Sequence, residues 1–288
     1  MTRLVALVAS ILAALAALAA CSPLGAINAF VRSDTHRLSE GLPYGPLPRH
    51  KLDVYTPLSV AASAGWPVVV FFYGGNWTAG ERADYKFVAE ALAERGVLVL
   101  VPDYRLYPAA TYPGFLEDSA RALAYGLDHA KALGGDPKRV FVMGHSAGGY
   151  NAGMLALDAR WLRATGHAPA ELGGWIGLAG AYDFFPLEPA QPARPVFHHP
   201  DYPAGGQPIE HVTAAAPKAF LAAPFADRVV SPERSTLQMA SKLRAAGVAV
   251  ELHQYERVSH STLIGAFGRP LRGLAPVLAD TAAWISAN

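Results

Sequence analysis

A serine in a glycine-rich turn is the residue of this sequence best suited to act as a nucleophile. Residues 140–150 read VFVMGHSAGGY, so that Gly144, Ser146 and Gly148 fit the pattern G-x-S-x-G. In that pattern the serine occupies a sharp strand-to-helix turn, which projects its hydroxyl above a sheet. Apolar residues typical of a strand precede the turn here, and a pattern typical of a helix follows it. The sequence therefore predicts Ser146 as the nucleophile.

Two later residues could activate this serine. A serine hydroxyl attacks poorly unless a histidine takes its proton and a carboxylate orients that histidine. Where a nucleophile occupies such a turn, the chain order is serine, then acid, then histidine. Asp227 and His260 follow the last two predicted strands in that order. Because ligands gather at the carboxyl ends of parallel strands, we expect the three side chains to meet there. Asp183, which follows an earlier strand, is the alternative acid.

Acyl transfer also needs hydrogen-bond donors for the negatively charged oxygen of the intermediate. One predicted donor is the backbone amide of Ala147, directly after the serine. The other lies in the loop after an early strand, which reads YGGNW over residues 73–77. Its two glycines leave backbone amides open to a substrate, so we expect Gly75 and Asn76 to donate. The alternative is a glycine turn that only ends the strand.

Composition argues against several other kinds of site. Lys and Arg number 24 and Asp and Glu number 23, for a formal net charge of +1. Such a balance makes nucleic acid an unexpected partner. The single cysteine, Cys21, excludes an intramolecular disulfide and a zinc site of several thiolates. No third ligand is suitably spaced from His198 and His199, and no nucleotide-binding glycine motif occurs, so we expect no metal and no cofactor.

Hydrophobic patterning predicts the scaffold that must position these residues. Apolar residues make up 52% of the chain, enough for a sizeable core. Short apolar runs indicate buried strands, and longer amphipathic segments between them indicate helices. Their alternation predicts a mostly parallel sheet, with antiparallel pairing only at its N-terminal edge. The predicted strands are 52–55, 67–73, 97–101, 140–143, 174–180, 218–223 and 248–255. The predicted helices are 82–95, 113–133, 147–160 and 232–246, followed by a C-terminal helical region.

Residues 184–217 interrupt this alternation. The segment holds eight prolines and four aromatic residues, and it is too rich in proline for a sheet and long for a plain connection. We interpret it as a lid over the active site, with a passive surface loop as the alternative. Aromatic residues near the expected mouth predict an apolar acyl or aryl pocket; they are Trp77, Phe184, Phe185 and Phe197.

In their order along the chain, these motifs resemble those of α/β-hydrolase carboxylesterases. The similar group is broad and has hormone-sensitive-lipase-like, feruloyl-esterase-like and kynurenine-formamidase-like members. The resemblance covers roughly residues 45–285, and the matching segments are LDVY, YGGNW, VPDYRL, GHSAGG, GLAGAYD, ADRVV and SHSTL. It implies the α/β-hydrolase fold, with a mostly parallel central sheet, helices on both faces and a short lid insertion. Two positions depart from the family pattern: Tyr73 replaces a histidine before the oxyanion glycines, and Ala223-Pro224 replaces His-Gly before the acid.

The expected activity is hydrolysis of small acyl or aryl esters through an acyl-enzyme intermediate. Ser146 would attack, His260 would move the proton, and Asp227 would orient His260. Cleavage of an aryl formamide by the same machinery is a close alternative. A non-catalytic envelope lipoprotein that uses the hydrolase fold for binding is an alternative of a different class. The sequence predicts no particular oligomeric state.

The N-terminal residues have the pattern of an export signal. A basic residue precedes an apolar run over residues 4–20, and small residues follow it. The tetrapeptide LAAC at residues 18–21 resembles the lipobox of bacterial lipoproteins, in which the cysteine is lipidated and becomes the mature N-terminus. We therefore expect lipidation of Cys21 and a lipid anchor in the cell envelope, with Ser22 favouring the outer membrane. A secreted or periplasmic protein and an uncleaved membrane anchor are the alternatives.

This interpretation divides the chain into three parts. Residues 1–20 are the expected signal peptide, residues 21–40 a tether, and residues 41–288 the α/β-hydrolase domain, with residues 184–217 as its lid-like insertion. The expected partners are a small-molecule ester and, through the lipid anchor, a membrane.

Overall fold

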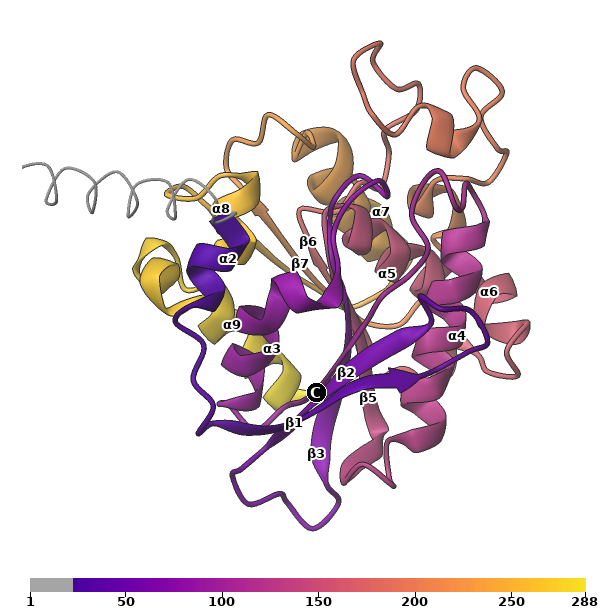
Figure 1. The fold of residues 1–288 in the computed structure, drawn as a ribbon. Helices are drawn as coiled ribbons and strands as arrows, with labels where there is room; N and C mark the ends of the chain where they lie inside the picture. Colours follow the sequence, from indigo (N-terminus) through magenta and orange to yellow (C-terminus); the bar gives the residue numbers. More distant parts are fainter. Residues whose placement is uncertain (1–22) are drawn as a thin grey trace, which may run out of the picture.

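An eight-stranded sheet is the central element of the computed structural model, which describes residues 23–288 (Figure 1). The strands are β1 (His36–Pro43), β2 (Lys51–Pro57), β3 (Trp66–Phe72), β4 (Leu98–Pro102), β5 (Gly135–His145), β6 (Gly174–Leu178), β7 (Ala219–Pro224) and β8 (Val250–Tyr255). Their order across the sheet is β1-β2-β4-β3-β5-β6-β7-β8. β2 pairs antiparallel with both β1 and β4, and all pairings from β4 to β8 are parallel. The predicted mostly parallel sheet with an antiparallel N-terminal edge is confirmed.

Helices cover both faces of this sheet. They are α2 (Pro23–Asn28), α3 (Lys86–Ala93), α4 (Gly114–His129), α5 (Ala147–Leu157), α6 (Ala159–Arg163), α7 (Gln238–Ala245), α8 (His260–Gly265) and α9 (Val277–Ala287). Figure 1 shows α3 and α9 on one side of the sheet, and α4, α5 and α6 on the other. Short helical turns complete the chain: η1 (Arg82–Tyr85), η2 (Pro169–Glu171), η3 (Pro195–Phe197), η4 (Pro208–His211), η5 (Glu233–Leu237) and η6 (Arg269–Leu274). This arrangement is the α/β-hydrolase fold.

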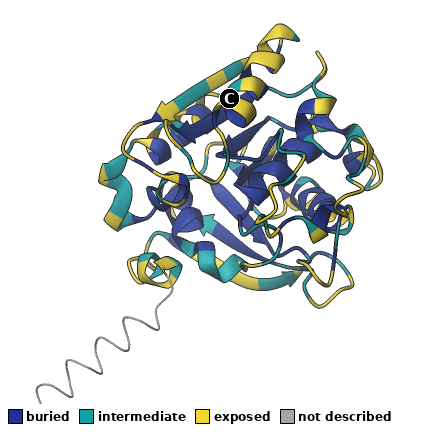
Figure 2. Cartoon of the chain, turned by 90° about the horizontal axis from the view of Figure 1, so that it is seen from above, coloured by how far each residue is buried: buried dark blue, intermediate teal, exposed yellow. Residues whose placement is uncertain are grey.

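The apolar runs that predict strands form the core. The five side chains of residues 68–72 in β3 are completely buried, and every residue of β4 is buried as well. Figure 2 shows the central strands buried, with partly exposed helices, loops and edge strands around them. Each large apolar side chain buried in this way contributes about 1.5–3 kcal/mol to folding. The core therefore holds the carboxyl ends of the strands, where the predicted site residues lie, in fixed positions.

The start of the described chain packs against the domain, which corrects the tether expected over residues 21–40. α2 lies beside η1 and α3, and Asn28 joins them. Its side-chain amide donates to the carbonyls of Ala83 and Asp84 over 3.0 and 2.9 Å, and its side-chain oxygen accepts the amide hydrogen of Phe87 over 3.1 Å. β1 then adds an edge strand to the sheet. Leu24, Ile27 and Val31 are partly buried against the core as well, but they are too few and too irregularly spaced to give the apolar pattern of a buried element.

The predicted signal peptide and Cys21 lie outside the described residues. Within residues 23–288, no helix has both the length and the apolar character needed to cross a lipid bilayer.

Candidate active site

Ser146 occupies the turn between β5 and α5, as the sequence pattern predicts. Its backbone has φ 56° and ψ −121°, in the left-handed half of the conformational map that side-chain-bearing residues rarely adopt. Its amide donates to the carbonyl of Leu178 in β6 over 3.0 Å, which holds the turn against the neighbouring strand. Such a conformation costs of order 1–3 kcal/mol and persists only where the surrounding structure imposes it.

The two glycines that flank the serine are required by close backbone packing. A Cβ atom added to Gly144 would lie 1.9 Å from the carbonyl oxygen of Gly148. One added to Gly148 would lie 2.0 Å from the carbonyl oxygen of Phe72 in β3. Both contacts are with backbone atoms, which cannot move aside as a flexible side chain could. The two glycines of the G-x-S-x-G pattern are therefore required for α5 to pack onto the end of the sheet.

His260 and Asp227 meet Ser146 at the carboxyl ends of the strands. His260 Nε2 lies 2.8 Å from Ser146 Oγ, and His260 Nδ1 lies 2.7 Å from Asp227 Oδ2. The histidine is the first residue of α8, after β8, and the Ser259 hydroxyl caps that helix by accepting the amide hydrogen of Thr262. The structure thus brings together the three residues that the sequence predicts as a triad.

The carboxylate of Asp227 is buried and well supplied with donors. Its side chain is 1% exposed, and Oδ1 accepts the amide hydrogens of Val229 and Val230 over 2.7 and 3.2 Å. Burial alone would raise the pKa of this carboxyl group. The hydrogen bond and charge interaction with His260, together with the two amides, outweigh burial and lower the pKa below its ordinary value. Asp227 is therefore ionised and can stabilise a positive charge on the imidazole.

Asp183, the alternative acid, makes different contacts. Its carboxylate accepts a hydrogen bond from Arg234 over 3.0 Å, and it has no contact with His260. The turn at Pro224, a departure from the family pattern, still leads the chain to Asp227. Pro224 ends β7 in register with Tyr255 of β8, and the next amide, that of Phe225, donates to the Tyr255 carbonyl over 2.8 Å.

His145 supports the loop that carries His260. Its Nε2 atom lies 3.0 Å from the backbone carbonyl oxygen of His260, and because a carbonyl can only accept, Nε2 carries the hydrogen. The two rings also pack with their centroids 4.9 Å apart. Burial, followed by the nearby charge of His260, lowers the pKa of His145 to about 3. His145 is thus a neutral packing residue below the catalytic histidine.

The predicted oxyanion donors lie beside the nucleophile. Asn76 and Ala147 line the same cavity as Ser146, and a Cβ atom added to Gly74 would lie 3.0 Å from the Cβ of Ser146. Gly75 and Asn76 have φ values of 127° and 53°, which turn this loop across the end of β3. Within residues 23–288 neither amide donates a hydrogen bond, and Ala147, at the first position of α5, has no acceptor inside its helix.

Tyr73 anchors this oxyanion loop from below. Its hydroxyl donates to Asp103 Oδ1 and accepts from Arg49 Nη2, both over 3.0 Å. Its carbonyl oxygen accepts the hydroxyl hydrogen of Tyr104 over 2.7 Å. Arg49 also donates to the carbonyl of Gly80, three residues beyond the YGGNW segment. The residue that departs from the family pattern thus takes a buried, fully hydrogen-bonded position beneath the loop and leaves its amides open.

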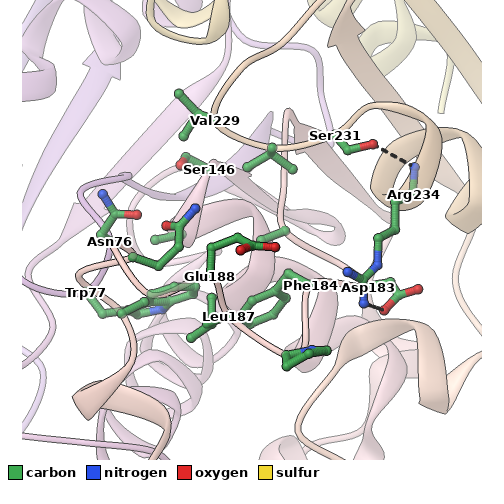
Figure 3. A pocket seen from close by; sticks show the side chains of 16 residues that line it. Asn76, Trp77, Ser146, Asp183, Phe184, Leu187, Glu188, Val229, Ser231 and Arg234 are labelled. Atoms are coloured by element: carbon green, nitrogen blue, oxygen red, sulfur yellow. Dashed lines mark hydrogen bonds and ion pairs between the residues drawn. The ribbon is translucent and has the colours of Figure 1, made fainter. Parts of the chain in front are cut away.

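A cavity of about 200 Å³ opens beside Ser146. Its lining includes Trp77 and Phe184, two of the aromatic residues expected at the mouth (Figure 3). Phe197 packs behind them, fully buried, with its ring centroid 4.8 Å from that of Trp77. Phe185 likewise stacks away from the cavity, on Tyr202 at 4.5 Å. The segment over residues 184–217 therefore supplies one wall of the cavity and part of the packing behind it.

Charged residues that sequence reasoning missed also line this cavity. They are Glu188 in the proline-rich segment and Arg234 in η5, together with Asp183, which was considered only as an acid for the triad. Glu188 and Arg234 lie in no recognisable motif, whereas Asp183 ends the family segment GLAGAYD. Arg234 donates to Asp183, and the proline-rich segment brings Glu188 to the same cavity; no periodicity of the sequence signals this arrangement.

The histidine pair considered as metal ligands has other partners. His198 Nε2 lies 2.7 Å from the carbonyl oxygen of Tyr112, and His199 contacts Arg194 and Tyr202. In the described part of the chain, no three or more His, Cys, Asp or Glu side chains are grouped so that they could hold a metal ion.

Models of two protein families match this sequence. The model described as the prolyl oligopeptidase family matches residues 125–287, more than half of the chain, and that range contains Ser146, Asp227 and His260. The model described as BD-FAE matches residues 52–170, which contain the oxyanion loop and the nucleophile turn.

Two individual relatives carry the names of esterases. A protein named as a probable isoprenylcysteine alpha-carbonyl methylesterase of Arabidopsis thaliana is 28% identical over 266 residues, which cover 85% of this chain and 62% of that protein. A carboxylesterase of Mycobacterium tuberculosis is 42% identical over 95 residues, which cover 33% of this chain and 30% of that protein. The chain thus spans less than two thirds of the length of these relatives.

Solved structures share the fold. A truncated carbohydrate esterase from gut microbiota has a TM-score of 0.75 at 17% identity, over 89% of this chain and 98% of that one. An esterase of Pyrobaculum calidifontis has a TM-score of 0.73 at 21% identity, over 91% and 88% of the two chains. At these identities the likeness shows the fold alone.

Proposed function

The chain belongs to the prolyl oligopeptidase family of α/β-hydrolases, and we propose that it is a serine hydrolase that cleaves small carboxylic esters through an acyl-enzyme intermediate. The observation that carries this proposal is the line of hydrogen bonds from Ser146 through His260 to Asp227, with distances of 2.8 and 2.7 Å, at the edge of an open cavity. Such a line is the arrangement that activates a serine hydroxyl.

In the first half of the reaction, Ser146 Oγ attacks the carbonyl carbon of the ester while His260 Nε2 accepts the hydroxyl proton. Asp227 stabilises the positive charge that forms on the imidazole, because its buried carboxylate is already ionised. His260 then gives the proton to the departing alcohol. In the second half, His260 takes a proton from water while the water oxygen attacks the acyl carbonyl carbon, and His260 then returns that proton to Ser146 Oγ as the bond between Ser146 and the acid product breaks.

The negative charge of each tetrahedral intermediate is held by the amides of Gly75, Asn76 and Ala147. These amides are fixed before substrate binds, so they need little rearrangement when the charge develops. A single donor of this kind typically accounts for about 10²–10³ in kcat. The reaction needs no metal and no cofactor in this scheme, because the three side chains and the amides supply every proton transfer and charge interaction.

The size of the cavity favours small substrates. A volume of about 200 Å³ accommodates a short acyl chain or one aromatic ring, and Trp77 and Phe184 give it an aromatic wall. The same machinery would cleave an aryl formamide, and the aromatic wall is the observation that favours this second candidate. The names of the relatives, a methylesterase and a carboxylesterase, support the ester.

The proposal is tested by hydrolysis of p-nitrophenyl acetate and butyrate, with an aryl formamide assayed beside them. Ser146→Ala should reduce turnover by at least about 10³-fold because the nucleophile is gone. Ser39→Ala, at an exposed position on β1, is the matched control and should keep wild-type turnover. Equal turnover by the wild type and Ser146→Ala would refute the serine mechanism, and turnover no faster than the uncatalysed reaction in both would favour a non-catalytic role for the fold.

We also propose that the chain is exported and anchored to the cell envelope through lipidated Cys21. The support is the basic start, the apolar run and the LAAC tetrapeptide of the sequence. In bacterial cells that make the full chain, the wild type should partition with membranes and with a detergent phase, and Cys21→Ser should not carry the lipid. Mass spectrometry of the N-terminal peptide would identify the modification. An unlipidated mature chain in the periplasm or medium would contradict the anchor.

A further inference from the structure

Glu188 presents an unpaired carboxylate to the cavity that contains Ser146. The residue lies in the lid-like segment, and its backbone carbonyl accepts the amide hydrogen of Gln191 over 3.0 Å, which closes a turn. Its side chain makes no hydrogen bond and no ion pair within residues 23–288. Figure 3 shows this carboxylate in the middle of the group of cavity-lining side chains, between Phe184 and Ser146 in that view. The carboxylate is therefore available to a bound molecule.

The other charges of the cavity cancel each other. Arg234 donates to Asp183 over 3.0 Å and also to the carbonyl of Phe185, so its guanidinium is held at one side of the cavity. The backbone amide of Arg234 donates to Ser231 Oγ over 3.1 Å, which fixes the start of η5 (Figure 3). Among the lining residues, the only other charged one is Glu188. The cavity thus carries a net charge of one negative unit, and that unit belongs to Glu188.

Apolar side chains line much of the rest of the cavity. Leu187 and Phe184 lie beside Glu188 in the lid-like segment, and Val229 and Val230 line the cavity from the loop that carries Asp227. The Phe184 ring stacks on Trp77 with centroids 6.0 Å apart. A substituted ammonium group suits such surroundings, because its methyl or methylene groups contact apolar surface while its charge faces the carboxylate. Aromatic ring faces also attract cations.

We propose that Glu188 is a specificity-determining residue that selects esters bearing a positively charged ammonium group in their acyl or alcohol part. The inference rests on the proposed ester hydrolysis and names the substrate class for that site. Glu188 does not take part in the bond-making steps. It raises kcat/KM for a cationic ester by attracting the charged end while Ser146 reacts with the carbonyl.

The expected size of the effect follows from the position of Glu188. Glu188 is exposed to solvent, so water and salt screen its charge. A charge pair a few ångströms apart in such surroundings changes kcat/KM by about tenfold. The preference should weaken as salt is added, which distinguishes a charge effect from a change of shape.

The first experiment places the cation in the leaving group. Butyrylthiocholine and S-(3,3-dimethylbutyl) thiobutyrate differ only in the exchange of a quaternary nitrogen for carbon, so they have the same shape and differ in charge. The released thiol is measured with a disulfide reagent. The second experiment places the cation in the acyl group, with p-nitrophenyl 4-(trimethylammonio)butanoate compared with p-nitrophenyl 5,5-dimethylhexanoate. The two experiments distinguish the two sides of the ester.

Each substrate pair gives a ratio of kcat/KM, charged over neutral, which is compared among variants. Glu188→Gln should lower this ratio about tenfold in at least one pair, chiefly through a fall in kcat/KM for the charged ester. Glu188→Lys should reverse the preference. Glu40→Gln is the matched control, because it removes the same charge from an exposed position on β1 and should leave the ratio unchanged.

The outcomes separate the two proposals. If the wild type hydrolyses the neutral esters and the ratio is the same in wild type, Glu188→Gln and Glu188→Lys, the inference about Glu188 is wrong and the proposed esterase function stands. If the folded wild type hydrolyses none of these four esters and neither p-nitrophenyl acetate nor p-nitrophenyl butyrate, the proposed function fails, and the inference fails with it.

Discussion

Asp227 both orients His260 and supplies the negative charge beside it. Its carboxylate lies 2.7 Å from His260 and accepts two backbone amide hydrogens. Asp227→Asn should lower kcat for p-nitrophenyl butyrate by about 10⁴-fold, because the amide favours the wrong tautomer of His260 and offers no charge to the imidazolium. Asp183→Asn should change KM more than kcat, because that carboxylate lies in the cavity wall. A larger loss of kcat in Asp183→Asn than in Asp227→Asn would contradict this assignment.

The sequence predicts these residues because their chemistry has a local pattern. The glycines around Ser146 are needed by backbone packing, and the acid and the histidine follow strands that hydrophobic runs identify. Glu188 and Arg234 have no such pattern. Both line the cavity because of how the proline-rich segment packs beside η5, and contacts such as the stacking of Phe184 on Trp77 hold that segment in place. Contacts of this kind between distant segments leave no periodic trace in one sequence.

His145 makes stability depend on pH. Its pKa in the folded chain is about 3, against an ordinary value of 6.5. Between these values the unfolded chain binds a proton that the folded chain does not, so the free energy of unfolding falls as the pH falls. This residue alone should remove about 2 kcal/mol of stability between pH 7 and pH 5.

A glutamine at this position tests that effect. His145→Gln keeps an N–H group that can donate to the carbonyl of His260 but has no proton to gain in this range. Urea unfolding at pH 7 and pH 5 should therefore show a smaller loss of stability on acidification in His145→Gln than in the wild type. The same pH dependence in both proteins would show that His145 titrates normally in the folded state.

At the scale of elements, burial decides what the sequence can predict. Strands β4, β6 and β7, residues 68–72 of β3 and residues 140–145 of β5 are buried, and each appears in the sequence as a largely apolar run. β1 has the sequence HRLSEGLP, and most of its residues are at least partly exposed, because it lies at the edge of the sheet. An edge strand needs only backbone hydrogen bonds to its neighbour, so its side chains need not alternate. This explains why residues 36–40 were expected to belong to a tether.

The oxyanion loop gives a prediction at the same scale. Tyr73→Phe removes the hydroxyl that joins Arg49 and Asp103 and leaves buried polar groups with fewer partners. The free energy of unfolding should fall by about 1–3 kcal/mol, and kcat should fall several-fold as the loop amides become less fixed. Urea unfolding and p-nitrophenyl butyrate kinetics would measure both. Tyr107→Phe is the control, because the Tyr107 hydroxyl makes no hydrogen bond in the described chain and the residue is 38% exposed. Wild-type stability in Tyr73→Phe would contradict the anchoring role.

At the scale of the whole molecule, the site is assembled across half of the sheet. Ser146 follows β5, Asp227 follows β7 and His260 follows β8, and 114 residues separate the serine from the histidine. β6 lies between β5 and β7, and its Leu178 carbonyl accepts the amide hydrogen of Ser146. The triad therefore requires four strands in their correct order, although β6 contributes no member of it.

Because the triad requires these four strands, we expect hydrolytic activity to recover late in folding. Contacts between residues far apart in sequence form slowly, because long loops must close before such contacts are made. After dilution from urea, helical circular dichroism should recover before hydrolysis of p-nitrophenyl butyrate does, and the two time courses can be compared in one refolding series. Recovery of activity ahead of the circular dichroism signal would contradict this order. An ester assay on this chain thus reports the joining of distant parts of the sheet, in addition to the presence of a serine nucleophile.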